Sequence, residues 1–253
     1  MGIGPGQGAV NGARPPPPIE AARRAWHMAP ETPEGPMTDF AARRRMMVDT
    51  QIRPSDVTRF PVIDAFLRIP REAFVPEGRQ EAAYVEENLP LGQGRVMLEP
   101  RTLAKLVDAL ALGPEDLVLD VGSGLGYSAA ILSRLAGTVV ALEEDEDMAR
   151  EAEAALSQRG LDNAAVVTGP LSGGAPKHGP YDAILIQGGI ESLPDAIADQ
   201  LAEDGRIGTV FMDGALGEAR IGRKHGGRIA WRLAFNAAAP VLGGFETARA
   251  FTL

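Results

Sequence analysis

The chain has 253 residues, 45% of them hydrophobic, and a formal net charge of −9 at pH 7. This length supports one α/β domain with a buried core, and the absence of cysteine excludes disulfides, thiolate metal sites and a cysteine nucleophile. The acidic balance argues against nucleic acid as a partner, and without a run of 18 apolar residues or a signal-peptide pattern we expect a cytoplasmic protein that does not enter a membrane.

The first 36 residues differ in composition from the remainder of the chain. They contain 8 prolines and 6 glycines, so these two types fill 14 of 36 positions. This share exceeds the roughly 25–30% that is typical of disordered segments. We therefore predict a flexible Pro/Gly-rich tail over residues 1–36, with Met37 as a natural beginning of the folded part.

Residues 37–116 read as a helical N-terminal region on the substrate side. Thr38 is placed to cap a helix that runs through Asp49, and a short apolar-faced helix is expected over Val62–Leu67. Apolar residues at helical spacing predict a third helix over Arg101–Leu112. Prolines divide this region into turns at Pro70, Pro76, Pro90 and Pro100.

From residue 117 to the C-terminus, strand-like and helix-like segments alternate. Strands are expected at Leu117–Val121, Thr138–Glu143, Ala164–Thr168, Ala183–Gln187 and Arg206–Phe211. Helices are expected between them at Ser128–Leu135, Asp145–Gln158 and Leu193–Leu201. A hairpin of Glu218–Arg223 with Arg228–Phe235 follows, and then a final strand near Thr247–Leu253. The pattern predicts a Rossmann-like, doubly wound and mostly parallel α/β sheet with antiparallel C-terminal strands, the architecture of the large methyltransferase class.

The most informative stretch is Leu117–Tyr127, which reads LVLDVGSGLGY. An apolar strand carrying Asp120 ends in a loop with glycines at Gly122, Gly124 and Gly126, after which a helix is expected. Glycines allow the backbone to approach a ligand closely, and a helix N-terminus favours anionic groups. The next strand ends in Glu143, 23 positions after Asp120, near the spacing at which an acid binds ribose hydroxyls.

Two cofactor classes compete for this loop. From Gly124 the residues GLGYSA also satisfy a relaxed dinucleotide fingerprint, which keeps a nicotinamide-dependent oxidoreductase as a further reading. The carboxylate of Asp120 would repel a pyrophosphate but attract a sulfonium and an ammonium. Because S-adenosyl-L-methionine carries both cations and no phosphate, charge favours this cofactor and therefore a methyltransferase.

The cofactor then suggests a role for each residue. Gly122, Ser123 and Gly124 bring the backbone to the methionine part, Asp120 faces its cationic end, and Glu143 accepts the ribose hydroxyls. The predicted cofactor-binding set is completed by Gly126, Tyr127 and Gln187. We predict no metal site, because His27, His178 and His225 lack metal-ligand spacing. Methyl transfer to an ionised oxygen needs alignment in a dry site and no general base.

From about Met47 onward the chain resembles the protein-L-isoaspartate O-methyltransferase family. The resemblance rests on MVDTQI, VIDAFLRIPREAFVP, AYVEENLPLGQG, VLDVGSGLGYSAAIL and LPDAIADQLAEDGRIG. It implies methylation of the α-carboxylate of isoaspartyl residues in damaged proteins, so that a protein or peptide is the substrate. The ester collapses to a succinimide, which reopens partly to normal aspartate.

The chain departs from this family at two places. Where the family usually carries Thr-Ile-Ser-Gln-Pro, with the Ser at the active site, this chain reads Val96 to Pro100, and Leu98 replaces the hydroxyl. The family's Gly-Asp-Gly after the third strand is Gly169-Pro170-Leu171 here. Because of these departures the catalytic residue is unknown, and an alternative function is open: a cofactor-binding member of the family with a changed acceptor, or one with a regulatory role and no catalysis. The resemblance places the substrate side of the site at Gly92, Gln93, Val96, Leu98 and Glu99.

Overall fold

The structure is a computed structural model that describes residues 1–2 and 39–247. The chain divides into two units, Met1–Thr38 and Asp39–Leu253. The helices of the second unit are α2 (Phe40–Met47), α3 (Phe60–Arg68), α4 (Pro100–Leu110), α5 (Tyr127–Ser133), α6 (Glu146–Ser157) and α7 (Asp195–Gln200). Its short helical turns are η1 (Val48–Ile52), η2 (Arg53–Ser55), η3 (Arg71–Phe74), η4 (Gln80–Ala82) and η5 (Leu171–Gly173). No helix within the described ranges is long and apolar enough to cross a membrane.

A sheet of seven strands forms the centre of this unit. Their order is β5-β4-β3-β6-β7-β8-β9; the first five strands in this order are parallel, and β8 and β9 are antiparallel to their neighbours. The strands are β3 (Leu117–Val121), β4 (Thr138–Glu143), β5 (Ala164–Thr168), β6 (Tyr181–Ile190), β7 (Leu201–Asp213), β8 (Leu216–His225) and β9 (Arg228–Asn236). The predicted fold class and C-terminal hairpin are confirmed, and β3, β4 and β5 have the predicted bounds.

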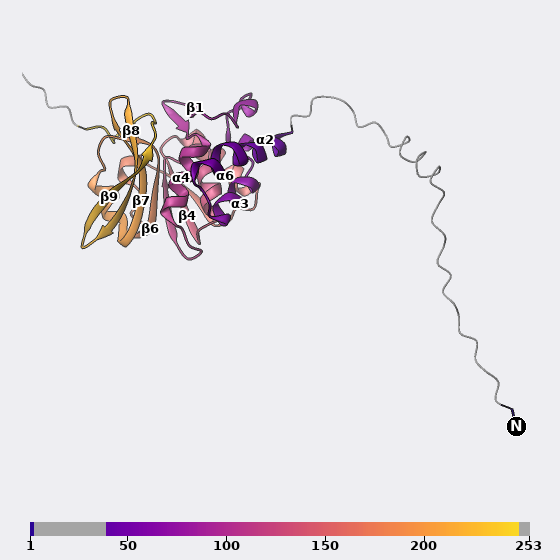
Figure 1. Ribbon diagram of the computed structural model, residues 1–253. Helices are drawn as coiled ribbons and strands as arrows, with labels where there is room; N and C mark the ends of the chain where they lie inside the picture. Colours follow the sequence, from indigo (N-terminus) through magenta and orange to yellow (C-terminus); the bar gives the residue numbers. More distant parts are fainter. Residues whose placement is uncertain (3–38, 248–253) are drawn as a thin grey trace, which may run out of the picture. The chain divides into compact units, whose positions relative to one another are not determined.

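Alternation along the strands sends successive side chains to opposite faces of the sheet. On β3, Val118 belongs to the larger buried cluster, which includes residues of α3, α4 and α5, and Leu119 belongs to a second cluster that includes α7. Figure 1 shows α2, α3 and α6 toward one side of this unit, while β8 and β9 end the sheet on the opposite side. The same alternation directs Asp120, Glu143 and Gln187 toward the first, helix-covered face.

A small hairpin that the sequence patterns did not predict lies apart from this sheet. Strand β1 (Leu89–Gly92) pairs with β2 (Arg95–Met97) in an antiparallel two-stranded sheet, with Gln93 at a φ of 49° in the turn. A side chain added at Gly124 would meet Leu91 at 2.6 Å, so the hairpin rests directly on the glycine loop after β3. Figure 1 shows β1 above one edge of the main sheet.

The N-terminal helices differ in detail from the prediction. The cap of α2 is Asp39, whose carboxylate accepts from the backbone N–H of Ala42, and Thr38 lies outside the described residues. The helix also changes to the π-helical turn η1 after Met47 instead of continuing as α-helix through Asp49.

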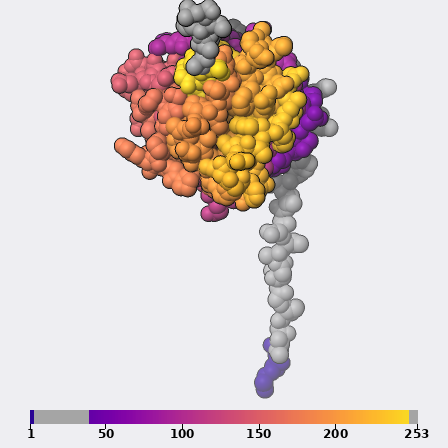
Figure 2. Space-filling view, turned by 90° about the vertical axis from the view of Figure 1, so that its left-hand side faces the viewer, coloured from indigo at the N-terminus to yellow at the C-terminus, as the bar shows by residue number. Residues whose placement is uncertain are grey.

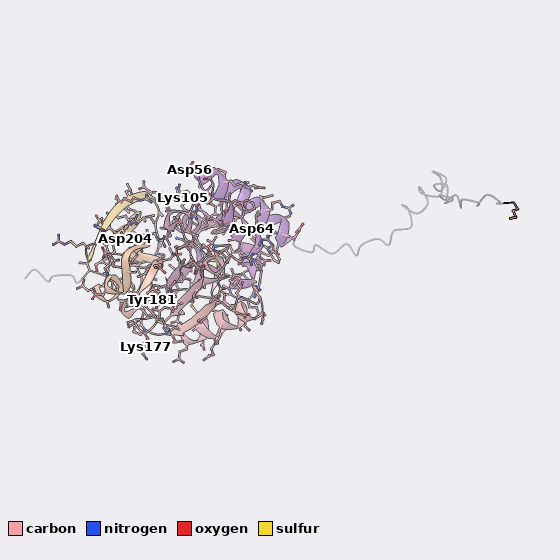
Figure 3. All side chains as sticks on the ribbon, turned by 90° about the horizontal axis from the view of Figure 1, so that it is seen from below. Asp56, Asp64, Lys105, Lys177, Tyr181 and Asp204 are labelled. Atoms are coloured by element: carbon pink, nitrogen blue, oxygen red, sulfur yellow. The ribbon has the colours of Figure 1, made fainter. Side chains whose placement is uncertain are left out.

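An ion pair connects α4 to the segment after η2. Lys105 of α4 lies 3.9 Å from Asp56, and Figure 3 shows this pair well away from Tyr181 and Lys177.

The C-terminal strands form one face of the molecule. Figure 2 shows this face, where the orange and yellow surface belongs to the last third of the sequence.

The helix predicted over Leu193–Leu201 is shorter, because Leu201 already begins β7 and pairs with Tyr181 of β6. Most of the predicted tail and the last six residues of the predicted final strand lie outside the described residues.

Candidate active site

The glycine loop follows β3 directly and is tied to β4. The backbone N–H groups of Gly122 and Ser123 donate to the carbonyl oxygen of Leu142, at 2.8 and 3.1 Å. Gly122, Gly124 and Gly126 have φ values of 78°, 56° and 92°, a region in which other residues are strained. Glycine is therefore required by the path of the backbone here, whatever the ligand.

Asp120 lies beneath this loop and is fully buried. Its two carboxylate oxygens accept from the hydroxyl of Ser128 at 2.6 Å and from the side-chain amide of Gln187 at 2.9 Å. Burial raises the pKa of Asp120 to about 7, although both hydrogen bonds and Arg95 favour the charged form and Glu143 opposes it. The structure thus brings together Asp120 and Gln187, two of the residues predicted for the cofactor, by a direct hydrogen bond.

This raised pKa predicts a pH dependence of stability. Between the ordinary value of 3.8 and about 7 the folded protein holds the proton of Asp120 more tightly than the unfolded chain does. The stability that protonated Asp120 adds to the folded protein is therefore fully present below pH 3.8 and is lost as the pH rises through 7. The free energy of unfolding of the cofactor-free protein falls between these two pH values. Urea denaturation from pH 5 to 8 should show this fall in the wild type but not in Asp120→Asn.

A second variant tests the cause. Ser128→Ala removes a donor that favours the charged carboxylate, so the decline should move to higher pH. Parallel profiles for the wild type and Asp120→Asn would contradict the assignment.

Glu143 ends β4 and is also fully buried. One of its oxygens, Oε2, accepts from the backbone N–H of Gly124 at 2.7 Å. The other, Oε1, accepts from the N–H groups of Glu144 and Asp145 and from Nη1 of Arg95, which lies 2.7 Å away. The acid predicted for ribose hydroxyls therefore lies at the glycine loop, where it forms a buried ion pair with Arg95 of β2.

Arg95 closes the space above the loop. A Cβ placed on Gly122 would lie 2.6 Å from Nη2 of Arg95, so the guanidinium group covers the loop backbone. A cavity of about 10 Å³, roughly the room for one water molecule, lies beside it. Because cofactor pockets measure several hundred Å³, this cavity is too small for a nucleoside with the hairpin in this position. The cavity lining includes Val96, Gly122, Ser123, Tyr127, Ser128 and Gln187.

The structure separates the five residues predicted on the substrate side. Gly92 and Gln93 lie at the hairpin turn, where the amide of Gln93 donates to Asp145, and Val96 lines the small cavity. Leu98 instead is 0% exposed and belongs to the large hydrophobic cluster. Glu99 accepts from the hydroxyl of Thr102 at the start of α4. Val96 is therefore the one of these five that lines the cavity.

Comparison with known proteins assigns the chain to a protein family. A model of the protein-L-isoaspartate(D-aspartate) O-methyltransferase (PCMT) family matches residues 42–212. The chain belongs to this family. The protein-L-isoaspartate O-methyltransferase of Roseiflexus sp. (strain RS-1) is 40% identical over 169 residues, which are 67% of this chain and 77% of that protein. Protein-L-isoaspartate O-methyltransferase 1 of Rhodopseudomonas palustris (strain HaA2) is 40% identical over 170 residues, 67% and 69% of the two chains.

Solved structures share the fold of this chain. A protein-L-isoaspartate O-methyltransferase superposes with a TM-score of 0.71 at 24% identity, covering 79% of this chain and 66% of that one. A PCMT from Plasmodium falciparum, solved with S-adenosyl-L-homocysteine, gives 0.68 at 18% identity over 79% of this chain and 97% of its own. At identities of 24% and 18%, these two superpositions show only that the fold is shared.

Two arginines that the sequence patterns did not single out organise the site. Arg95 is one, and Arg71, from the IPREAFVP block of the family resemblance, is the other. Arg71 is 0% exposed; its Nε donates to the carbonyl of Ala83 at 2.6 Å and its Nη2 to that of Leu98 at 2.8 Å. Its guanidinium also lies 4.9 Å from the ring centroid of Tyr127. Arg71 therefore joins the segment before α4 to the start of α5.

Replacing Arg71 by Met should lower the free energy of unfolding by about 2–3 kcal/mol, because two buried carbonyls lose their donors. Burial lowers the pKa of Arg71, so removing this desolvated charge offsets part of the loss. Urea denaturation measures the change. Arg68→Met is the matched control, since its side chain is 61% exposed and its ion pair with Asp64 contributes little. Equal effects of the two substitutions would contradict the role of Arg71.

Proposed function

We propose that this protein transfers the methyl group of S-adenosyl-L-methionine to the α-carboxylate of isoaspartyl residues in proteins or peptides. Membership of the family supports the reaction, and one structural observation carries the assignment to this site. Asp120, Glu143 and Gln187, from three adjacent parallel strands, meet at the glycine loop on the carboxyl edge of the sheet. Ligands of open α/β sheets bind at this edge.

The polar groups at the loop suit an adenosyl cofactor with a cationic end. Glu143 would hold the ribose hydroxyls, the backbone of Gly122 and Gly124 would approach the methionine part, and Asp120 would face the sulfonium and ammonium. The hydroxyl of Ser123 has no hydrogen-bond partner within the described residues, although the residue is only 5% exposed. A buried group of this kind requires a partner, which a bound ligand would supply.

When bound, the cofactor supplies an electrophilic methyl group. The residues of this chain have to align an acceptor oxygen with it and exclude water. An isoaspartyl carboxylate is already ionised at neutral pH, so the reaction needs no general base. The apolar lining of the cavity by Val96, Leu103 and Leu125 provides the dry surroundings that this alignment needs.

The proposal is tested by a methyl-transfer assay with two peptides. The peptides have the same sequence and differ only in carrying an isoaspartyl or an aspartyl residue at one position. With labelled S-adenosyl-L-methionine, we expect label in the isoaspartyl peptide, in a base-labile ester, and none in its twin. Absence of transfer to the isoaspartyl peptide by protein that binds S-adenosyl-L-homocysteine would reject the proposed acceptor and leave the cofactor assignment intact.

We further infer that the protein works in the cytoplasm on protein substrates rather than on nucleic acid. Its net charge of −9 disfavours binding to a polyanion. Sedimentation with and without duplex DNA or RNA at low salt would test this, and stable co-sedimentation would contradict it.

A further inference from the structure

The guanidinium group of Arg95 is only partly satisfied. Arg95 is 5% exposed, and Nη1 is bound to Glu143, with Glu144 a further 3.9 Å contact. Its other two nitrogens, Nε and Nη2, are buried and have no hydrogen-bond partner in the described part of the chain. These two nitrogens form one edge of the guanidinium plane, the edge that binds both oxygens of a carboxylate side-on. The ion pair with Glu143 leaves that edge free.

The cofactor and Arg95 compete for Glu143. Both carboxylate oxygens are engaged: Gly124 donates to Oε2, and Oε1 takes three donors, of which Arg95 is the one on a movable side chain. Because Glu143 is 0% exposed, ribose hydroxyls can reach it only if a group that covers it withdraws, and Arg95 is the covering group on a movable side chain. A buried guanidinium that loses its carboxylate is strongly destabilising unless another anion takes its place.

We propose that Arg95 binds the α-carboxylate of the acceptor once the cofactor has taken its place on Glu143. The inference rests on the proposed function, because an isoaspartyl acceptor brings a carboxylate to this cavity. The guanidinium of Arg95 lies against Gly122, which lines the cavity, and Met97, on the same face of β2 as Arg95, lines it too. A short movement of the hairpin therefore keeps the guanidinium beside the acceptor. The free edge of Nε and Nη2 provides the two donors.

This role accounts for the departures at Val96 and Leu98. In this family the corresponding positions usually carry hydroxyls, with the Ser at the active site, and an arginine can bind the same carboxylate with a charge-assisted pair. Methyl transfer forms an oxygen–carbon bond on the acceptor and breaks the sulfur–carbon bond of the cofactor. The ester is neutral, so Arg95 loses its anion at that step. Its return to Glu143 then favours release of S-adenosyl-L-homocysteine.

The test compares the wild type with Arg95→Gln and Arg95→Lys in binding and in steady-state kinetics. Arg95→Gln should raise the KM for the isoaspartyl peptide about 30- to 100-fold while kcat changes less than about 3-fold, the pattern of lost substrate binding. Arg95→Lys, which keeps the charge but not the fork, should raise KM less. By calorimetry on the cofactor-free protein, Arg95→Gln should bind S-adenosyl-L-homocysteine as tightly as the wild type or more tightly, since a competitor for Glu143 is gone.

Three results would overturn the proposal. An unchanged KM with tighter cofactor binding would make Arg95 a competitor for Glu143 and nothing more. Weaker binding of S-adenosyl-L-homocysteine with unchanged binding of 5′-methylthioadenosine, which lacks the carboxylate, would assign Arg95 to the cofactor instead. If the wild type binds S-adenosyl-L-homocysteine but never methylates isoaspartyl peptides, the isoaspartyl carboxylate is not the acceptor. This outcome contradicts the proposed function itself, and it is seen in the wild type before any variant is compared.

Arg206→Gln is the matched control. Arg206 also has a partly buried ion pair, 2.6 Å from Asp116, and an unpartnered buried Nε. Asp116 precedes β3, at the opposite end of that strand from the glycine loop. This substitution should lower stability without moving the KM for the peptide.

Discussion

Glu143→Gln is expected to weaken the binding of S-adenosyl-L-homocysteine by about 100-fold or more. Each hydrogen bond from a ribose hydroxyl to an ionised carboxylate is worth about 1.5–3 kcal/mol, and the proposed site uses two of them. An amide offers one acceptor oxygen, which the N–H groups of Gly124, Glu144 and Asp145 already require. Calorimetric titration measures the affinity, under conditions in which circular dichroism shows that the variant is folded.

The same substitution should lower the free energy of unfolding by about 3–5 kcal/mol, because it leaves the guanidinium of Arg95 buried without a carboxylate. The double variant Arg95→Met with Glu143→Leu removes both charges and should recover most of this stability without recovering cofactor binding. Loss of stability and loss of binding are then separated in one set of proteins.

Glu144→Gln is the control for this set. Glu144 is the next residue, its side chain is 44% exposed, and it lies 3.9 Å from Arg95. We expect a change of less than about 0.5 kcal/mol in stability and unchanged affinity. Wild-type affinity in Glu143→Gln would refute the assignment of Glu143 to the cofactor.

Leu98→Ser is expected to destabilise the protein by about 3–5 kcal/mol without increasing isoaspartyl methylation. The family resemblance places Leu98 at the position of the family's active-site Ser, so on that reading the substitution restores the family's residue type. In this structure the side chain is 0% exposed in the main hydrophobic cluster. Serine would leave a cavity there and bury a hydroxyl among apolar groups, and both effects cost stability. Urea denaturation and the two-peptide assay measure the two outcomes.

Leu98→Met serves as the matched variant, because it conserves volume and should cost less than about 1.5 kcal/mol. A stable Leu98→Ser protein with a higher kcat/KM for the isoaspartyl peptide would show that this position reaches the acceptor. The structure would then describe a conformation different from the active one.

The gathering of Asp120, Glu143 and Gln187 at the glycine loop could be predicted because it depends on local patterns. Asp120 and Glu143 end or nearly end short apolar runs, and strands of a parallel sheet bring their carboxyl ends to one edge. The bounds of β3 and β4 followed from the same apolar runs. Alternation then puts both acids, with Gln187, on one face.

The hairpin of β1 and β2 and its ion pair with Glu143 could not be predicted from such patterns. Strands β1 and β2 have four and three residues, with Pro90 inside the first, so neither shows a usable alternation. The ion pair of Arg95 joins residues 48 positions apart, and only the folded hairpin brings them together. The resemblance places Leu98 at the acceptor, yet its apolar side chain packs into the core.

The proposed chemistry depends on a binding site for an adenosyl cofactor at the glycine loop and Glu143. Calorimetric titration of the cofactor-free wild type with S-adenosyl-L-homocysteine, and separately with NAD, examines this site without any variant. We expect saturable binding of one S-adenosyl-L-homocysteine per chain and no heat with NAD. Binding of NAD without binding of S-adenosyl-L-homocysteine, or binding of neither, would contradict the assignment of the site.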